Sequence, residues 1–270
     1  MSRAFQLVDA WPTAASIVIV TADGQVARHG DQRSVIRLAS VTKALVSMST
    51  WVAIEEGSAR LDDRVGPPGS TLHHLLSHCS GLNFDDGQVI TRPGTRRIYS
   101  NTGWDLAAAH LAEMTGIATS TYLHEAVFAP LGMSSTVLHG SPSKDVHGCC
   151  ADLEQVCIEL LHPTLVSPST IADATTTQFP GLSGILPGVG RFDPLDWGLG
   201  VQVNWSASMP WAATHLSARS FGHFGATGTF LWVDPMAGVA VACLTGTEFG
   251  PWALEHWPVF GDAVLDEHGR

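Results

Sequence analysis

Ser40 and Lys43 stand three residues apart at the start of a long apolar run. Residues 41–54 contain no Pro or Gly, which predicts a helix that begins near Ser40 and ends at Gly57. A spacing of three puts both side chains on one helix face. Burial would lower the pKa of Lys43, and the helix N-terminus offers N–H groups where a hydroxyl becomes an anion. The pair is therefore suited to an activated serine nucleophile.

A second Ser-x-x-Lys copy, Ser141 to Lys144, shows how easily this short motif arises by chance. It contains Pro142 and lies in a loop rich in Gly, Ser and Pro. That copy lacks the helix that the mechanism needs, so we expect Ser40 and not Ser141 to be the nucleophile.

Tyr99 and Asn101 form the second constellation, just before a predicted helix over residues 101–116. A phenol beside a lysine amine can shuttle protons to a serine or to a leaving group. The alternative is a structural role, in which Tyr99 packs on the helix start and Asn101 caps it. Within the helix, Thr102 and Asp105 have the spacing of a capping box.

The third constellation is the glycine-rich stretch 221–228, between two predicted strands. Its glycines would let a substrate approach the backbone of a sheet edge. The N–H of Ala226 could then face the N–H of Ser40 and complete an oxyanion hole. The spacing does not fit a dinucleotide-binding fingerprint. The alternative is a glycine-rich hairpin with a structural His223.

Together, Ser40-x-x-Lys43, Tyr99-x-Asn101 and His223-x-Gly225 resemble the three signature elements of the serine β-lactamase and penicillin-binding-protein superfamily. The nearest branch contains class C β-lactamases, D,D-peptidases, D-aminopeptidases and β-lactamase-like esterases. Further stretches follow the family's order: residues 74–82, 93–94, 99–103, 130–133, 151–153, 197–200 and 233–235.

This resemblance implies acyl transfer through an acyl-enzyme on Ser40, without a cofactor or metal. Lys43 and Tyr99 would share the acid and base work, and which of them takes the serine proton stays open. Asn101 would orient Lys43 and the substrate, and the N–H groups of Ser40 and Ala226 would bind the oxyanion. His223 would line the cleft and help to protonate the leaving group.

The third element departs from the Lys-Thr/Ser-Gly of β-lactamases, because His223 and Phe224 replace the charge and the hydroxyl. A neutral imidazole and a phenyl ring would bind a carboxylate weakly. We therefore expect a carboxylesterase-like hydrolase of small esters. The alternatives are a β-lactamase, D,D-peptidase or D-aminopeptidase-type amide hydrolase, and a non-catalytic relative that only binds a ligand.

Composition limits the partners. The chain of 270 residues is 45% hydrophobic and carries a net charge of −11. This charge argues against nucleic acid and anionic membranes, because binding to them needs basic clusters. No signal peptide or membrane span is visible, so we expect a cytoplasmic protein that acts on a small ester or amide. Five cysteines, an odd number, fit reduced thiols.

Other residues that could bind a metal or take part in a reaction have less support. His74 and His78 are one helical turn apart and, with His73 and Cys79, could suggest a metal site. A looser His/Cys cluster spans residues 147–162. We expect both to be structural. The tryptophans at 197, 205, 211, 252 and 257 are expected in the core and the cleft lining.

The order of elements predicts an α/β fold of the α+β type. Strands are expected at 15–20, 26–30, 197–204, 218–224, 229–234 and 239–245. Helices are expected at 40–56, 71–78, 101–116, 120–129, 151–161, 169–175 and 252–267, with loops at 82–98, 139–148 and 162–190. We expect one antiparallel sheet built from both termini, flanked by helices. The single domain 1–270 would have two sublobes: 1–60 with 190–270, and the mainly helical insert 61–189.

Overall fold

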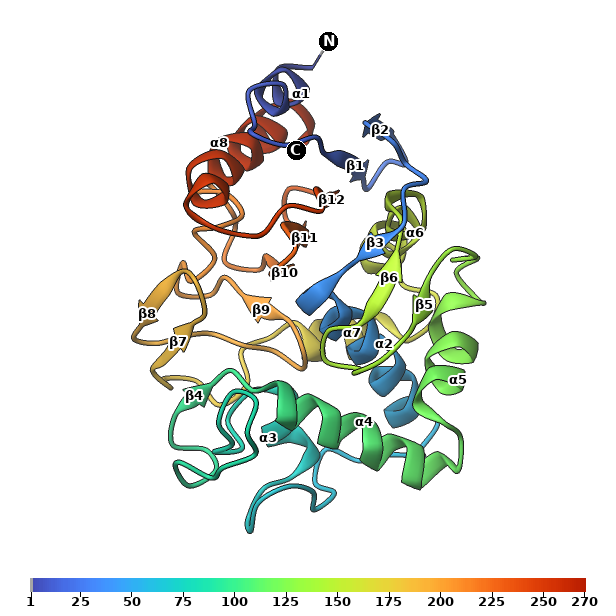
Figure 1. Cartoon of the computed structure of the whole chain (residues 1–270), viewed down its shortest axis with the longest axis vertical. Helices are drawn as coiled ribbons and strands as arrows, with labels where there is room; N and C mark the ends of the chain where they lie inside the picture. Colours follow the sequence, from blue (N-terminus) through green and yellow to red (C-terminus); the bar gives the residue numbers. More distant parts are fainter. Residues whose placement is uncertain (1) are drawn as a thin grey trace.

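A computed structural model describes residues 2–270 and contains a central six-stranded antiparallel sheet (Figure 1). Its order is β2(Val26–His29), β1(Ser16–Thr21), β12(Val239–Leu244), β11(Thr229–Asp234), β10(Phe221–Gly225) and β9(Gln202–Val203). β1 and β12 pair along their whole length, from Ser16 opposite Leu244 to Thr21 opposite Val239. The predicted sheet built from both termini is thus confirmed.

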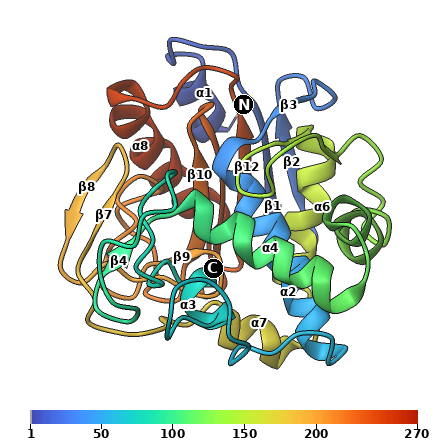
Figure 2. The ribbon, with the colours of Figure 1, turned by 60° about the horizontal axis from the view of Figure 1, so that its bottom comes forward.

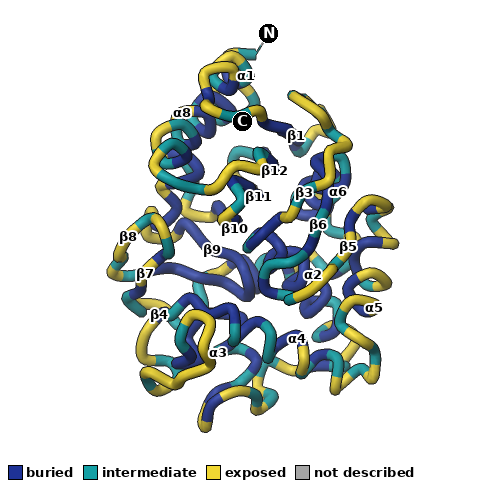
Figure 3. The backbone as a smooth tube through the Cα atoms, viewed as in Figure 1, coloured by how far each residue is buried: buried dark blue, intermediate teal, exposed yellow. Residues whose placement is uncertain are grey.

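Alternation along these strands produces two hydrophobic layers, because successive side chains point to opposite faces. Ile17 and Ile19 of β1 pack with α1(Arg3–Val8) and α8(Pro251–His268). Val18 and Val20 pack with α2(Thr42–Glu55) and α6(Cys150–Leu161) on the other face. α1 and α8 lie against each other (Figure 1). The strands of the central sheet are buried throughout except for the edge strand β2, which is partly exposed (Figure 3).

The rest of the chain is more helical (Figure 2). It holds α3(Leu72–Leu76), α4(Asn101–Thr115), α5(Thr119–Leu123), the π-helical turn His124–Phe128 and α7(Pro168–Ala174). Two small sheets join it to the terminal segments. One contains β3(Ile36–Arg37), β6(Val146–Gly148) and β5(Val137–Leu138), and the other contains β4(Arg97–Ile98), β7(Gly184–Leu186) and β8(Gly190–Phe192).

Several sequence predictions of local structure were wrong. The expected loops 139–148 and 162–190 contain β6 and β7, and β8 begins at the end of the second loop; these strands of three residues each are too short for a periodic pattern. The strand expected over 197–204 is reduced to β9. The helix expected over 71–78 ends earlier, because His78 adopts a left-handed backbone with φ of +54°. Trp205 is exposed, although we expected it in the core or cleft.

The expected sublobe boundaries stay a prediction. α6 belongs by sequence to the expected insert, yet it packs on β1 and β12 of the central sheet. Across residues 2–270, none of the helices combines the length and the apolar character that a membrane crossing requires.

Candidate active site

Ser40 lies half-buried in η1(Ala39–Val41), a 3-10 turn directly before α2. The preceding residue, Ala39, has a φ of +47°, a conformation that is strained for a residue with a side chain. The backbone just before Ser40 is anchored to the sheet, because Thr229 Oγ1 of β11 donates to the Leu38 carbonyl at 2.8 Å. Ser40 is therefore fixed between the sheet and the helix.

Lys43 lies in the first turn of α2 and is fully buried. Its Nζ donates to Asn101 Oδ1 at 2.7 Å and to the Ser143 carbonyl oxygen at 2.8 Å. Nζ is also 3.5 Å from Ser40 Oγ. A neutral amine has two N–H groups, and these two acceptors use both of them. The remaining lone pair is then available for the Ser40 hydroxyl.

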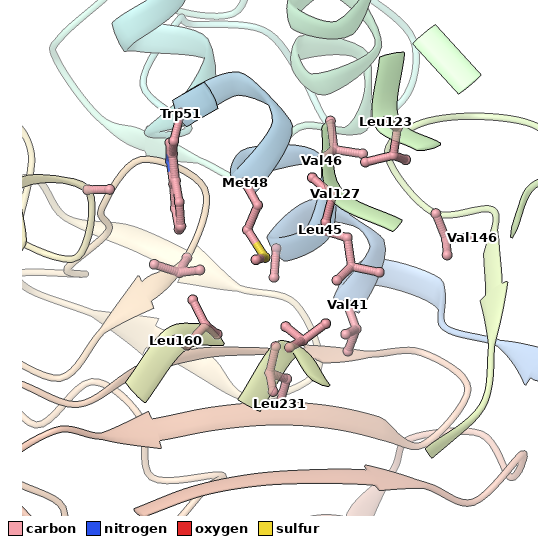
Figure 4. Close-up of a cluster of buried hydrophobic side chains, with 14 of the residues drawn as sticks. Val41, Leu45, Val46, Met48, Trp51, Leu123, Val127, Val146, Leu160 and Leu231 are labelled. Carbon is pink, nitrogen blue, oxygen red and sulfur yellow. The ribbon is translucent and has the colours of Figure 1, made fainter. Parts of the chain in front are cut away.

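The helix that carries Lys43 is enclosed on several sides, as its apolar sequence predicts. Figure 4 shows Val41 at the end of η1 and Leu45, Met48 and Trp51 of α2 pointing into the surrounding core. All four are almost completely buried. Close packing of this kind holds a side chain at a fixed position, which a catalytic geometry needs.

Burial lowers the pKa of Lys43 from its usual value to about 7. The positive charge of Lys144 also lowers it, whereas the carboxylates of Asp105 and Asp85 act in the opposite direction. The Lys43 amine therefore loses its proton far more readily near neutral pH than an exposed lysine does, and its neutral form can accept a proton.

Tyr99 comes just before α4 and contacts the same lysine. Lys43 Nζ lies 4.7 Å from the centre of the Tyr99 ring, whose other contacts include a stacked His78 ring at 4.4 Å. Burial raises the pKa of the Tyr99 phenol, and hydrogen bonding to Ser40 acts to lower it. The phenol is thus protonated at neutral pH and is placed beside the Ser40 hydroxyl.

Asn101 is the first residue of α4, but it does not cap the helix. Ser100 is the N-cap, and its Oγ accepts from the N–H of Gly103 at 3.0 Å, so the expected capping box of Thr102 and Asp105 was wrong. The Asn101 side chain is consequently free to bridge two charged groups. Its Oδ1 accepts from Lys43, and its Nδ2 donates to Asp85 at 2.9 Å.

The second Ser-x-x-Lys copy lies in this site, where sequence reasoning did not place it. Ser143 is fully buried, and its carbonyl oxygen accepts from Lys43. Lys144 Nζ lies 3.8 Å from Asp85. The sequence could not place this loop in the site, because the loop contributes a backbone carbonyl, a group present at every position in the chain.

His223 lies in the middle of β10 and is buried. Its Nδ1 donates to the Phe224 carbonyl at 2.7 Å, which leaves Nε2 as an acceptor. That Nε2 is buried and has no partner among residues 2–270. Burial and the nearby Lys43 lower the pKa of His223 to about 3. This geometry does not fit the expectation that His223 protonates a leaving group, because the free nitrogen carries no proton.

Gly225 allows the end of β10 to approach the turn that carries Ser40. A Cβ at this position would lie 2.5 Å from the Leu38 carbonyl oxygen and 3.1 Å from Ala39 Cβ. In the described part of the chain, the N–H groups of Ser40 and Ala226 donate to no other group. Both residues line one cavity.

This cavity of about 220 Å³ brings Ser40, Tyr99, His223 and Ala226 together. Its other lining residues are apolar or small: Phe84, Leu186, Pro187, Gly188, Phe224 and Phe249. No Lys or Arg side chain is among these lining residues, taken over residues 2–270. The cavity thus combines the Ser40 hydroxyl and the Tyr99 phenol with a mainly apolar lining.

The histidines considered for a metal site have separate partners. His73 Nε2 contacts Gln178 Oε1 at 2.8 Å, and His74 Nδ1 contacts Thr71 Oγ1 at 2.9 Å. His78 instead lies between Tyr99 and Trp104. Within the described range 2–270, no group of three or more His, Cys, Asp or Glu side chains is arranged to hold a metal ion.

The fold and this site are those of a serine hydrolase. The Beta-lactamase family model matches residues 6–260, and the chain belongs to that family. The structure is similar to the crystal structure of a beta-lactamase (Mb2281c) from Mycobacterium bovis. The two are 47% identical, with a TM-score of 0.96, over 99% of this chain and 100% of that one.

More distant relatives are named for different activities. The D-alanyl-D-alanine-carboxypeptidase/endopeptidase AmpH of Escherichia coli is 25% identical over 180 residues, 49% of this chain and 47% of AmpH. Penicillin-binding protein 4* of Bacillus subtilis is 26% identical over 150 residues, 42% of this chain and 33% of that protein. The chain thus matches less than half the length of these curated relatives. EstCE1, a hydrolase with promiscuous acyltransferase activity, shares the fold at 17% identity, with a TM-score of 0.78 over 97% of this chain and 96% of that one.

Proposed function

We propose that this serine hydrolase cleaves esters of small uncharged acyl groups through an acyl-enzyme on Ser40. The observation that supports this most is the lining of the cavity. Where a cation would hold a substrate carboxylate, the site has a neutral His223 and the Phe224 ring. A carboxylate placed there would lose its hydration without gaining a charged partner, which is costly.

In the proposed acylation step, Ser40 Oγ attacks the ester carbonyl as its proton moves to the neutral Nζ of Lys43. The lone pair of Lys43 is available for this proton because Asn101 and Ser143 accept from its two N–H groups. The carbonyl oxygen becomes negative and is bound by the N–H groups of Ser40 and Ala226. The bond from the carbonyl carbon to the alkoxy oxygen then breaks, leaving an acyl-Ser40 ester.

The leaving alkoxide needs a proton, and we assign the delivery to Tyr99. Its phenol is protonated at neutral pH, as the raised pKa of Tyr99 requires. The phenolate left after this transfer regains a proton from the Lys43 ammonium, which took up the serine proton and whose Nζ lies beside the Tyr99 ring. A water molecule then attacks the acyl-Ser40 carbonyl and releases the acid, with the same groups acting in reverse.

A panel of substrates tests the proposal. We expect the wild type to hydrolyse 4-nitrophenyl acetate and butyrate, and Ser40→Ala to abolish that turnover while the circular dichroism spectrum is unchanged. The control is Ser134→Ala, which changes an exposed serine that does not line the cavity. Full activity of the Ser40→Ala variant would show that another residue is the nucleophile. Labelling of Ser40 by a phosphonate without any turnover would favour a ligand-binding protein.

Amide hydrolysis is the second candidate function, and the names of the relatives favour it. The Mycobacterium bovis protein is called a beta-lactamase, and AmpH is a D-alanyl-D-alanine-carboxypeptidase/endopeptidase. The same nucleophile and amine serve both reactions, so the cavity lining has to decide between them. A chromogenic cephalosporin in the same panel distinguishes the two, because faster turnover of the lactam than of the esters would overturn our assignment.

A further inference from the structure

A second groove continues from the catalytic cavity on the side of Tyr99. Three residues, Phe84, Tyr99 and Pro187, line both the cavity and this groove, which has a volume of about 360 Å³. The groove is otherwise lined by Asn83, Ile90, Arg96, Arg97, Ile98, Gly184 and Ile185. A substrate bound at Ser40 can therefore extend into it past the Tyr99 ring.

The groove lies on the side where the leaving group departs. In the proposed mechanism, Tyr99 protonates the leaving oxygen, so the alcohol half of the ester must lie against the phenol. The acyl half then occupies the cavity between Phe224 and Phe249. This step rests on the proposed function, since it depends on the role of Tyr99.

The walls of the groove are unusually apolar for an exposed surface. Phe84, Ile90 and Ile185 are 41%, 54% and 60% exposed, and all three line the groove. Large exposed apolar side chains grouped at one place often mark a ligand or partner site. They offer contact to a hydrocarbon segment of the alcohol.

The two arginines of the groove differ in their partners. Arg97 is buried and donates to the carbonyl oxygens of Ser77 at 2.5 Å, Gln178 at 2.8 Å and Leu195 at 3.1 Å. Its charge is therefore directed into the protein, where it fixes the wall formed by β4 and β7. Arg96 is exposed and, within residues 2–270, makes no ion pair or side-chain hydrogen bond.

The carboxylates closest to the groove in sequence are already engaged. Asp85 accepts from Asn101 and faces Lys144, and Asp86 accepts from Asn83 Nδ2 at 3.0 Å. Arg96 is thus an unpaired cation at an apolar groove, in a chain whose net charge is −11. A guanidinium in this setting favours a carboxylate or phosphate, which it can bind through two N–H groups.

We propose that this groove binds the alcohol half of the ester and that Arg96, which lines it, binds an anionic group of that alcohol. The substrate class is an ester of a small acyl group with an amphiphilic alcohol that ends in a carboxylate or phosphate. The reaction releases the small acyl group as a carboxylic acid, and the anionic alcohol leaves through the open groove.

Matched substrates test this proposal. The probe is the butyrate ester of 6-hydroxyhexanoate, with shorter and longer homologues, each compared with its terminal carboxamide. We expect kcat/KM to favour the carboxylate form at the best chain length by about fivefold, a typical scale for an accessible charge pair. Arg96→Gln should reduce this ratio to about one, and Arg96→Lys should retain part of it. High salt should also reduce it.

The control is Arg92→Gln, which removes another exposed arginine of the same loop that does not line the groove. It should leave the ratio unchanged. An equal kcat/KM for both forms at all lengths, or an equal loss on both in Arg96→Gln, would overturn the proposal. The phosphate monoester of the same diol distinguishes a phosphate from a carboxylate preference.

A binding measurement separates this proposal from the proposed function. Turnover of the carboxamide ester by the wild type reports on the esterase activity alone. The Kd values of both ester forms for Ser40→Ala, and for Ser40→Ala with Arg96→Gln, report on the groove without turnover. Tighter binding of the carboxylate that depends on Arg96 would support the groove, and its absence would refute it even if the esterase activity is present.

Discussion

Lys43 Nζ lies 2.8 Å from the carbonyl oxygen of Ser143, a residue 100 positions further along the chain. With Asn101 Oδ1 at 2.7 Å, this carbonyl uses both N–H groups of a neutral lysine amine. Neither acceptor carries a full charge, so neither holds the lysine in its protonated form as an ion pair would. The loop around Ser143 thus orients the amine, and burial remains the main cause of the lowered pKa of Lys43.

The dependence of activity on pH follows from this. Burial lowers the pKa of Lys43 to about 7, so the neutral, proton-accepting amine increases as the pH rises through 7. We expect kcat/KM for 4-nitrophenyl butyrate to rise with pH and to level off above about pH 8. His223, with a pKa of about 3, does not contribute a change in this range. A profile that is flat or falls between pH 6 and about 8 would contradict this role of Lys43.

Two charge-removing variants should move that profile in opposite directions. Asp105 acts to raise the pKa of Lys43, so Asp105→Asn should shift the rise in kcat/KM to lower pH. Lys144 acts to lower it, so Lys144→Gln should shift the rise to higher pH. Each shift should be a few tenths of a pH unit, about 0.3–0.5, as expected for single charges acting through partly screened surroundings.

These variants need a control that shows whether the loop around Ser141 has moved. Ser141 Oγ donates to Asp105 Oδ1 at 2.5 Å, and asparagine keeps an oxygen at that position. The plateau value of kcat/KM at high pH should therefore stay within about threefold of the wild type. A large loss of the plateau without any shift would mean that the loop had moved and that the charges do not tune Lys43.

Tyr99→Phe tests the assignment of the proton donor. The variant keeps the ring that faces Lys43 and stacks on His78, and removes only the hydroxyl. We expect a loss of kcat of about 10²- to 10⁴-fold on alkyl esters, the usual contribution of a positioned acid. The loss should be smaller on 4-nitrophenyl esters, since nitrophenolate leaves without a proton. Equal losses on both would argue that Tyr99 acts on Ser40 and not on the leaving group.

The sequence predicted which side chains come together in the cavity better than it predicted the groups that hold them in place. Ser40, Lys43, Tyr99 and His223 have side chains with distinctive chemistry, and each stands next to a helix start or in a strand that periodicity indicates. Ser143 contributes only a carbonyl oxygen, which no residue type marks. The helix start at Asn101 was predicted, but the capping box of Thr102 and Asp105 was wrong, because Ser100 caps the helix two residues earlier. The side chain of Asn101 is held instead by tertiary contacts to Lys43 and Asp85, which no local pattern contains.

The same limit applies to the fold. The long strands β1, β11 and β12 are buried on both faces and were found from their apolar runs. β4 has two residues and β7 has three, and they exist because they pair with each other and because Arg97 ties them to the carbonyls of Ser77, Gln178 and Leu195. Such pairing is non-local, so no window of sequence contains the signal.

Gly225→Ala tests how closely β10 must approach the nucleophile. The added Cβ would lie 2.5 Å from the Leu38 carbonyl oxygen, backbone that cannot turn aside as a side chain can. The end of β10, with Ala226, must then move away from the turn that holds Ser40. We expect a loss of kcat/KM of about 100-fold, since a shift of about 1 Å in a reacting group has that effect. Overpacking should also lower the free energy of unfolding by about 1–3 kcal/mol.

Gly250→Ala is the matched control for this substitution, because its Cβ would meet only Trp252 Cδ1, at an ordinary 3.9 Å. It should change kcat/KM by less than about twofold. Activity is to be measured well below the melting temperature of both variants, so that loss of folded protein does not account for the result. If Gly225→Ala loses stability but keeps its kcat/KM, the N–H of Ala226 does not bind the oxyanion. In that case the second donor must come from elsewhere in the cavity.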